Sequence, residues 1–380
     1  MKRLVERWQI ARIRISHWEY WNSYLRYLPV LPYLFYLWLK ARNAFFFNAA
    51  NPGIEYGGLI MESKWKIHKS MPTGFFPDTI LVNPGEDISQ LIKRIDQQFT
   101  FPFILKPDTG SKGRGVAIIH NWGQLRLYHH HCPVSYLVQE KINYPMEAGI
   151  FYVRMPGESK GKITGIVEKE FIRIKGNGKL TLEQLLKQNP RYLLQVESLK
   201  RILGDDIMRS IPLNGEYITP VDIGNHARGS LFLNRSDRIT DNLAAMMDQL
   251  CKPVPGFYFG RLDIRFRSWD LLERGQDFAV IEINGAGSEP THIYDPSAKL
   301  MDAWKEICRH WKLIYHISQH NHKRGVKYLE WKEGIRLFRD NAKLDKKLRK
   351  FGQDCSLVIH HHHSRAENFC AYQSQQRPVS

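Results

Sequence analysis

Two short segments, GRLDIRF and VIEINGAG, carry polar side chains in a pattern that suits a metal ion. Side chains alternate between the faces of a strand, so Arg261, Asp263 and Arg265 share one face. Glu282 and Asn284 likewise point together from the second strand. If the strands are neighbours, oxygens of Asp263, Glu282 and Asn284 converge among arginines. Three oxygen donors without thiol or imidazole suit a hard cation, Mg²⁺ above all and Mn²⁺ in its place. The alternative is two edge strands that show charged faces to solvent.

A glycine-rich loop follows a strand that ends in a lysine, in the segment FILKPDTGSKGRGV. Glycine allows close approach, so backbone N–H groups around Gly113 and Gly115 could contact phosphate oxygens. The hydroxyl of Ser111 would add a donor, and Lys106 would place a point charge on a phosphate. Many surface loops have this composition, and the segment lacks the GK[ST] ending of a P-loop. The loop is therefore a weak signal by itself, and its meaning depends on the elements around it.

The length and the net charge of the chain limit the functions that it can have. The chain has 380 residues, and its net charge of +17 attracts an anionic partner. Nucleic acid, an anionic membrane surface and a polyphosphate substrate all qualify. The five cysteines are scattered without a CxxC pair, which argues against a disulfide framework or a zinc site. With no signal peptide recognised, we expect a cytoplasmic protein. The basic C-terminal region lacks any arrangement typical of specific nucleic-acid binding, so we expect a solvated tail there.

Beyond residue 50 the periodicity is that of a mixed helix and strand protein. It predicts strands at 77–82, 101–107, 135–142, 161–176, 216–224, 258–268 and 277–287. It predicts helices at 62–72, 87–99, 180–187, 239–251 and 297–317. The two polar strands are joined by WDLLERGQ, which reads as a polar turn.

The order of these parts resembles the ATP-grasp superfamily. A lysine and a glycine-rich loop are followed by LVQEKI, a glutamate, RLD and EIN, over roughly residues 60 to 315. Within the superfamily the chain is similar to D-alanine–D-alanine ligase and to the ATP-grasp part of cyanophycin synthetase. The resemblance implies an α+β fold in which two ATP-grasp subdomains clasp the nucleotide. The expected organisation is a helical extension at 1–50, subdomains at 51–137 and 138–318, and a basic tail at 319–380.

The resemblance also implies a set of nucleotide-binding residues. Lysines on the phosphates would be Lys64 and Lys106, beside the loop that contains Ser111, Gly113 and Gly115. The hinge that holds adenine would consist of Gln139, Glu140, Lys141 and Ile142. The carboxylate on the ribose hydroxyls would be Glu147.

Other residues are implied for the chemistry. Arg261 matches the arginine that meets the transferred phosphoryl group, and Lys169 matches a phosphate lysine more loosely. His226 and Arg228 lie in a loop that could also reach phosphate. The magnesium ligands would be Asp263, Glu282 and Asn284, in agreement with the pattern read from the strands.

The activity implied is ATP-dependent ligation of a carboxylate to an amine or a thiol, through an acyl phosphate and with release of ADP. ATP, an unidentified carboxylate and an amine are then the partners. One alternative is ATP-dependent phosphotransfer on the same fold. Another is a membrane-associated nucleotide-binding module without turnover.

The N-terminal region departs from the resemblance. Related ligases carry an N-terminal α/β domain, whereas this chain begins with a basic and aromatic helical stretch that includes YLPVLPYLFYLWLK. One interpretation is a segment that lies in the surface of an anionic membrane, where Trp and Tyr concentrate. The other is a buried helix that packs on the main body. The two differ in the exposure that they predict for Trp38 and for Phe45, Phe46 and Phe47.

Overall fold

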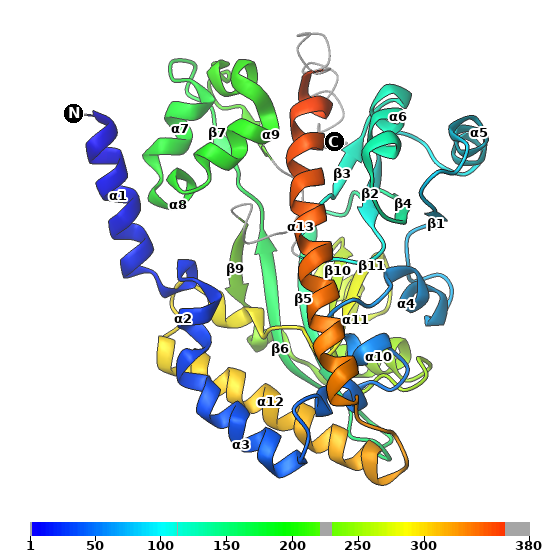
Figure 1. Cartoon of the computed structure of the whole chain (residues 1–380). Helices are drawn as coiled ribbons and strands as arrows, with labels where there is room; N and C mark the ends of the chain where they lie inside the picture. Colours follow the sequence, from blue (N-terminus) through cyan, green and yellow to red (C-terminus); the bar gives the residue numbers. More distant parts are fainter. Residues whose placement is uncertain (1, 112, 221–229, 362–380) are drawn as a thin grey trace.

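A computed structural model describes residues 2–111, 113–220 and 230–361 (Figure 1). It contains a four-stranded sheet in the order β1-β4-β2-β3, a five-stranded sheet in the order β11-β10-β5-β6-β9, and a two-stranded ribbon, β7-β8. Every strand pair within these sheets is antiparallel. Helices cover the sheets, so the predicted α+β class is confirmed.

The smaller sheet forms the first subdomain. Its strands are β1 (Thr79–Val82), β2 (Phe103–Pro107), β3 (Ala117–Ile119) and β4 (Tyr136–Glu140). Helices α5 (Ile88–Gln98) and α6 (Trp122–His131) begin at side-chain caps from Asp87 and Asn121. Both helices bury apolar side chains in one core with the strands. This core fixes the end of β2, where Lys106 lies. Helix α4 (Lys64–Ser70) precedes the sheet in the chain and carries Lys64.

One face of the larger sheet packs on a hydrophobic core. The other face is directed toward the first subdomain and the helical extension. Its strands are β5 (Met146–Val153), β6 (Lys162–Glu170), β9 (Leu231–Asn234), β10 (Phe259–Phe266) and β11 (Phe278–Asn284). Ala148, Ile150 and Tyr152 of β5 join the core with α10 (Asp241–Cys251) and α11 (Trp269–Glu273). Because side chains alternate, the intervening residues, including Glu147, project from the opposite face.

A small helical lobe is inserted into the second subdomain. It contains β7 (Ile174–Lys175), α7 (Leu182–Gln188), α8 (Pro190–Leu193), α9 (Val196–Arg209) and β8 (Tyr217–Ile218). Leu182, Leu186, Leu199 and Met208 form its own core. The single strand predicted at 161–176 is therefore divided: β6 ends at Glu170, and β7 pairs with β8.

The N-terminal extension is helical, as predicted. It comprises α1 (Lys2–Ser16), α2 (Ser23–Tyr27) and α3 (Leu31–Ala41), and α3 packs along α12 (Leu300–Lys323). Figure 1 shows these helices along one edge of the molecule, with α3 beside α12. Short 3₁₀ turns complete the connections: η1 (Trp18–Tyr20), η2 (Leu28–Val30), η3 (Phe46–Ala50), η4 (Glu55–Gly58), η6 (Ser236–Arg238) and η7 (Thr291–Tyr294).

The region expected to be a solvated basic tail contains a long helix, α13 (Trp331–His361). It contacts both α6 and α9, and it stands between them in Figure 1. Leu348 and Phe351 are buried in the core of the first subdomain. The helix thus packs one face on the body and leaves its charged face to solvent.

Further elements differ from prediction, among them β3, β9, α8 and α9, which were not predicted. The segment WDLLERGQ contains helix α11, capped by Ser268, where a turn was expected. Strand β5, at the centre of the larger sheet, was not predicted at all, and neither was α6. Among the described helices, none is long and apolar enough to cross a bilayer.

Candidate functional site

The two polar strands are neighbours. In the register of β10 and β11, Asp263 lies opposite Glu282 and Arg261 lies opposite Asn284. Directly opposed residues of an antiparallel pair have Cβ atoms about 5 Å apart on the same face. The two strands are thus paired, as the prediction from the sequence required, and the joint use of Asp263, Glu282 and Asn284 as metal ligands stays a prediction.

The charged groups on this face form a compact buried network. Asp263 accepts hydrogen bonds from Arg261 Nε at 2.8 Å and Nη2 at 3.1 Å, and Lys169 Nζ lies 3.3 Å from its other side. Lys169 also donates to Glu147 at 2.8 Å, and Arg265 Nε donates to Glu147 at 3.2 Å. Three cations and two carboxylates are thus held together in this network.

Asp263 and Lys169 favour the ionised form of each other. Burial tends to raise the pKa of Asp263, but Arg261 and Lys169 outweigh it, so the pKa lies below its ordinary value. Burial tends to lower the pKa of Lys169, but Asp263 and Glu147 outweigh it and raise the pKa. A buried ion cluster of this kind is costly unless every member is paired. The arrangement therefore places two charged cations, Arg261 and Lys169, directly beside Asp263.

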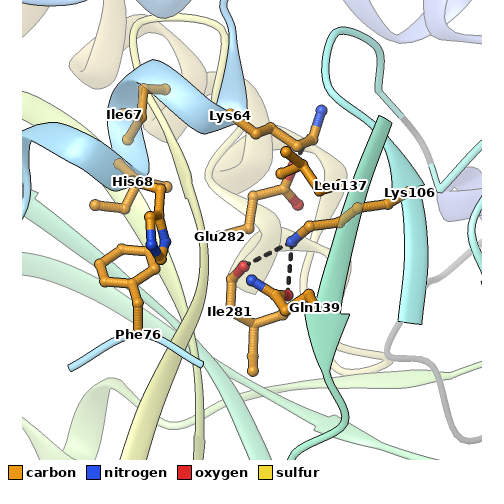
Figure 2. Close-up of a pocket in the computed structure, with 10 residues that line it drawn as sticks. Lys64, Ile67, His68, Phe76, Lys106, Leu137, Gln139, Ile281 and Glu282 are labelled. Atoms are coloured by element: carbon orange, nitrogen blue, oxygen red, sulfur yellow. Dashed lines mark hydrogen bonds and ion pairs between the residues drawn. The ribbon is translucent and has the colours of Figure 1, made fainter. Parts of the chain in front are cut away.

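Lys106 links the two sheets. Its Nζ donates to Gln139 Oε1 at 2.9 Å within its own sheet and to the carbonyl of Ile281 in β11 at 3.0 Å (Figure 2). Gln139 in turn donates to Thr79 at 2.9 Å, which fixes the orientation of its amide. Burial lowers the pKa of Lys106 to about 8, although the nearby carboxylate of Glu282 opposes the shift.

Lys64 approaches the same acidic strand from helix α4. Its Nζ lies 3.7 Å from Glu282 Oε1 and donates to the carbonyl of Gly110 at 2.6 Å. The start of α4 is held by Asp108, which accepts from Ser63 Oγ and from the backbone N–H of Trp65, both at 2.8 Å. Asp108 directly follows β2 and precedes the glycine-rich loop. Both lysines predicted from the sequence lie near Glu282, and Lys64 forms an ion pair with it.

A narrow pocket lies between α4, β2, β4 and β11. It is lined by Lys64, Ile67, His68, Phe76, Lys106, Leu137, Gln139, Ile281, Glu282 and Ile283 (Figure 2). Its volume is about 10 Å³, room for one water molecule, whereas ligand sites commonly have 300 to 1,000 Å³. A nucleotide could enter only if the sheets moved apart or side chains shifted.

The sequence interpretation missed several residues of this pocket. The rings of His68 and Phe76 make an edge-to-face contact with centroids 5.1 Å apart, and His68 also stacks on Trp65. Burial lowers the pKa of His68, and Lys106 adds to the effect. The spacing of Lys64 and His68 by four residues on a helix was the available signal, because such residues share a face.

The glycine-rich loop is held by helix α13. Gly113 and Gly115 have φ angles of 66° and 71°, a region that side chains disfavour. A Cβ on Gly115 would also lie 2.9 Å from Pro107 and 3.1 Å from Phe351. Arg114 forms an ion pair with Asp345 of α13. Ser111 is exposed, and Lys112 lies outside the described residues.

The residues expected to contact adenine and ribose differ in their exposure and in their hydrogen-bond partners. Glu140 is exposed at the end of β4, and Lys141 Nζ donates to Asn143 at 2.6 Å. The carbonyl of Ile142 accepts from Arg265 at 3.0 Å. The side chain of Gln139 holds Lys106, as described above, and Glu147 is held by two cations. Nucleotide contacts of these residues stay predictions, and His226 and Arg228 lie outside the described residues.

The paired strands carry oxygen atoms of the kind that a hard cation binds. Glu282 keeps 31% of its side chain exposed, and the side-chain nitrogen of Asn284 is buried without a hydrogen-bond partner among the described residues. Asp263 is committed to Arg261 and Lys169. No cluster of three or more His, Cys, Asp or Glu side chains in the described chain is arranged to hold a metal. An ion here would therefore need the oxygen of the Asn284 amide as a ligand, as well as the two carboxylates.

No protein-family model matches the sequence, and no curated protein matches it. Several solved structures are similar in part. The D-alanine–D-alanine ligase from Bacillus anthracis has a TM-score of 0.38 and 12% identity, over 69% of each chain. The VanG D-Ala:D-Ser ligase from Enterococcus faecalis has a TM-score of 0.38 and 12% identity, over 69% of this chain and 60% of that one.

The bifunctional glutathione synthetase from Pasteurella multocida has a TM-score of 0.34 and 12% identity, over 63% of this chain. The present chain covers only 34% of that longer protein. All of these TM-scores are low, so the functional assignment has to rest on the geometry of the site.

Proposed function

We propose that this protein is an ATP-dependent ligase of the ATP-grasp type, which activates a carboxylate as an acyl phosphate and joins it to an amine or a thiol. The observation that carries the proposal is the contact of Lys106 with the carbonyl of Ile281. The Nζ of Lys106, at the end of β2, donates to this carbonyl of β11 at 3.0 Å, so the two sheets meet beside Glu282. This contact supports a single site in which cations for the phosphates and oxygen ligands for a metal would lie together.

The cations divide into two groups. Lys64 and Lys106 lie where β2 and α4 meet β11, and we assign them to the phosphates of ATP. Arg261 and Lys169 lie on the larger sheet beside Asp263, and we assign them to the transferred phosphoryl group. Their charge offsets the negative charge that develops on the phosphoryl oxygens, so catalysis depends mainly on positioning and electrostatics.

Mg²⁺, or Mn²⁺ in its place, would be held by Asp263, Glu282 and Asn284. Bound there, the ion would neutralise phosphate charge and orient the oxygens of ATP. Because Asp263 is already paired with Arg261, its carboxylate would share its charge between the arginine and the ion.

The proposed reaction has two steps. A carboxylate oxygen of the first substrate attacks the γ-phosphorus, the bond from that phosphorus to the β,γ-bridging oxygen breaks, and ADP leaves. The neutral amine then attacks the acyl carbon, the carbon–oxygen bond to phosphate breaks, and the amine loses a proton. Acyl phosphates are good acyl donors because phosphate is a good leaving group. The adenine would occupy the space near Glu140 to Ile142 once the sheets move apart.

The test is a turnover screen with the full chain, ATP and Mg²⁺, against amino acids, peptides and lipid-linked acids. ADP should form only with a productive acid, and ¹⁸O from a labelled carboxylate should appear in the released phosphate. Hydroxylamine should trap the acyl phosphate as a hydroxamate. A stable phosphorylated product would instead indicate a phosphotransferase, and AMP would indicate adenylation. Binding of ATP without any turnover across the screen would contradict the ligase assignment.

A further inference from the structure

We propose that the outer face of α2, η2 and α3 binds the surface of an anionic phospholipid membrane, with these helices lying in the plane of the interface. The inference goes beyond the proposed catalysis. It rests on an apolar face that the protein body does not cover.

The segment from Tyr24 to Ala41 has apolar residues on two opposite sides. The inner side carries Val30, Leu34, Leu37 and Ala41, which are at most 8% exposed and pack with α12. The outer side carries residues that are all substantially exposed: Tyr24 85%, Leu25 59%, Leu28 60%, Leu31 45%, Phe35 56%, Tyr36 50% and Leu39 63%. Steps of three and four residues from Leu28 through Leu31 and Phe35 to Leu39 make one continuous stripe.

A helix that is apolar all round needs a second apolar environment. The body of the protein supplies one for the inner side only. The segment is too short to cross a bilayer, and Pro29 and Pro32 interrupt it, so insertion across the membrane is excluded for it. An amphipathic surface of this size, rich in Leu, Tyr and Phe, suits the boundary between headgroups and acyl chains.

The charge around the stripe favours lipid over a protein partner. No acidic residue occurs between Glu19 and Glu55, whereas Arg26, Lys40 and Arg42 lie along the segment. Lys40 reaches over the rings of Tyr36 and Tyr315, each at 5.6 Å, so its charge stays beside the apolar stripe. Exposed apolar residues with the charge of Lys40 beside them, in a segment without acidic side chains, complement an anionic headgroup layer, whereas the cores of protein interfaces are depleted in lysine.

The structure also resolves the two interpretations of this region. Phe45, Phe46 and Phe47 are buried in the core with α12, as expected for a segment that covers the body. Trp38 is 36% exposed and belongs to the rim of the outer stripe. One side of the extension therefore packs on the body of the protein, and the other side is an uncovered apolar surface.

The experiment is flotation of the full chain with vesicles of phosphatidylcholine alone and with added phosphatidylglycerol. The wild type should float with the anionic vesicles, and binding should fall when NaCl is raised from about 0.1 M to about 1 M, because salt screens the charges. The double variant Leu28→Glu/Leu39→Glu should lower the partition coefficient by about tenfold or more per leucine, since each loses the transfer free energy of a large apolar side chain.

The matched control is Ile211→Glu/Leu213→Glu, which places two glutamates at positions 54% and 73% exposed on a distant loop. It should float like the wild type. Circular dichroism would verify that both variants are folded. Failure of the wild type to float, or equal loss in the control, would overturn the proposal. A wild-type dimer that the Leu28→Glu/Leu39→Glu variant converts to a monomer, without vesicle binding, would instead show that the face joins two copies.

Discussion

Lys106 is buried and bridges the two sheets. Its burial lowers its pKa and makes its charge sensitive to pH. Its pKa of about 8 lies well below the ordinary value of a lysine because burial penalises the ammonium. The ammonium is therefore largely present below pH 8 and is lost above it. Only the charged form attracts phosphate.

We therefore expect the affinity for ATP to weaken as pH rises through 8, by up to about tenfold per unit above that value. Calorimetric titration at pH 7 and pH 9 would measure it, with adenosine as the ligand that should show no such change. Lys106→Arg should retain its charge and lose the dependence, and Lys106→Met should weaken ATP far more than adenosine. An affinity for ATP that is equal at both pH values would count against a phosphate role for Lys106.

The two carboxylates of the proposed metal site should differ in their effect on stability. Asp263 is 5% exposed and bound by Arg261 and Lys169, so Asp263→Asn leaves two buried cations poorly compensated. We expect it to lower the free energy of unfolding by about 3–5 kcal/mol. Glu282 is partly exposed, and Glu282→Gln should change stability by less than about 0.5 kcal/mol.

Both substitutions should lower ATP turnover by orders of magnitude if the carboxylates share an ion. Urea unfolding and ADP release would be measured on the same preparations. Near-normal turnover in Glu282→Gln would remove this residue from the proposed site, whatever its stability.

Secondary structure could be predicted where polar and apolar residues repeat with the period of a helix or a strand. The strands β10 and β11 and the helices α5, α10 and α12 show such patterns in their sequences and were predicted, although β10 is buried along almost its whole length and α12 extends to Lys323, beyond the predicted end at 317. Strand β5 was missed because its residues from Glu147 to Val153 are buried on both faces, which removes the alternation. The site residues on β10 and β11 followed from spacing alone, but their partners Lys169 and Glu147 could be placed only through long-range pairing.

The contact of helix α13 with the glycine-rich loop could not be predicted from the sequence. Its sequence is strongly charged, and the apolar positions that matter, Leu344, Leu348 and Phe351, repeat at helical spacing among lysines. Local sequence indicates a helix there at most. The position of the helix depends on contacts with Gly115 and Tyr128, which come together only in the folded subdomain.

We predict that Phe351→Ala destabilises the first subdomain by about 3–5 kcal/mol, because it removes a large buried ring that covers Gly115 and packs on Tyr128. Ile335→Ala on the same helix is the matched control, because Ile335 is 42% exposed, and it should cost less than about 1 kcal/mol. Urea unfolding followed by tyrosine fluorescence would compare them. Equal effects of the two substitutions would mean that α13 is not anchored through Phe351.

At the scale of the whole molecule, the helical extension is part of the body. Leu34, Leu37 and the phenylalanines at 45–47 share a core with α12. Removing residues 1–47 would expose that core, so we expect an aggregated or unfolded product. Removing only residues 1–16 should leave the melting temperature nearly unchanged, because α1 exposes most of its described side chains.

Thermal unfolding and size-exclusion chromatography of both truncations would test this. A monomeric, cooperatively melting protein without residues 1–47 would show that the extension is an independent attachment. Such a result would also leave the buried phenylalanines without a stabilising role.

The docking of α13 has a consequence for the order in which the protein becomes competent during synthesis. Chains fold as they leave the ribosome, with early segments forming first. The loop between β2 and β3 emerges long before Asp345 and Phe351, which later hold it. Likewise α3 is made well before its partner α12. The nascent chain therefore passes through a stage in which both sheets exist but the glycine-rich loop is not yet held by Asp345 and Phe351, and the loop reaches its final conformation only after α13 has been translated.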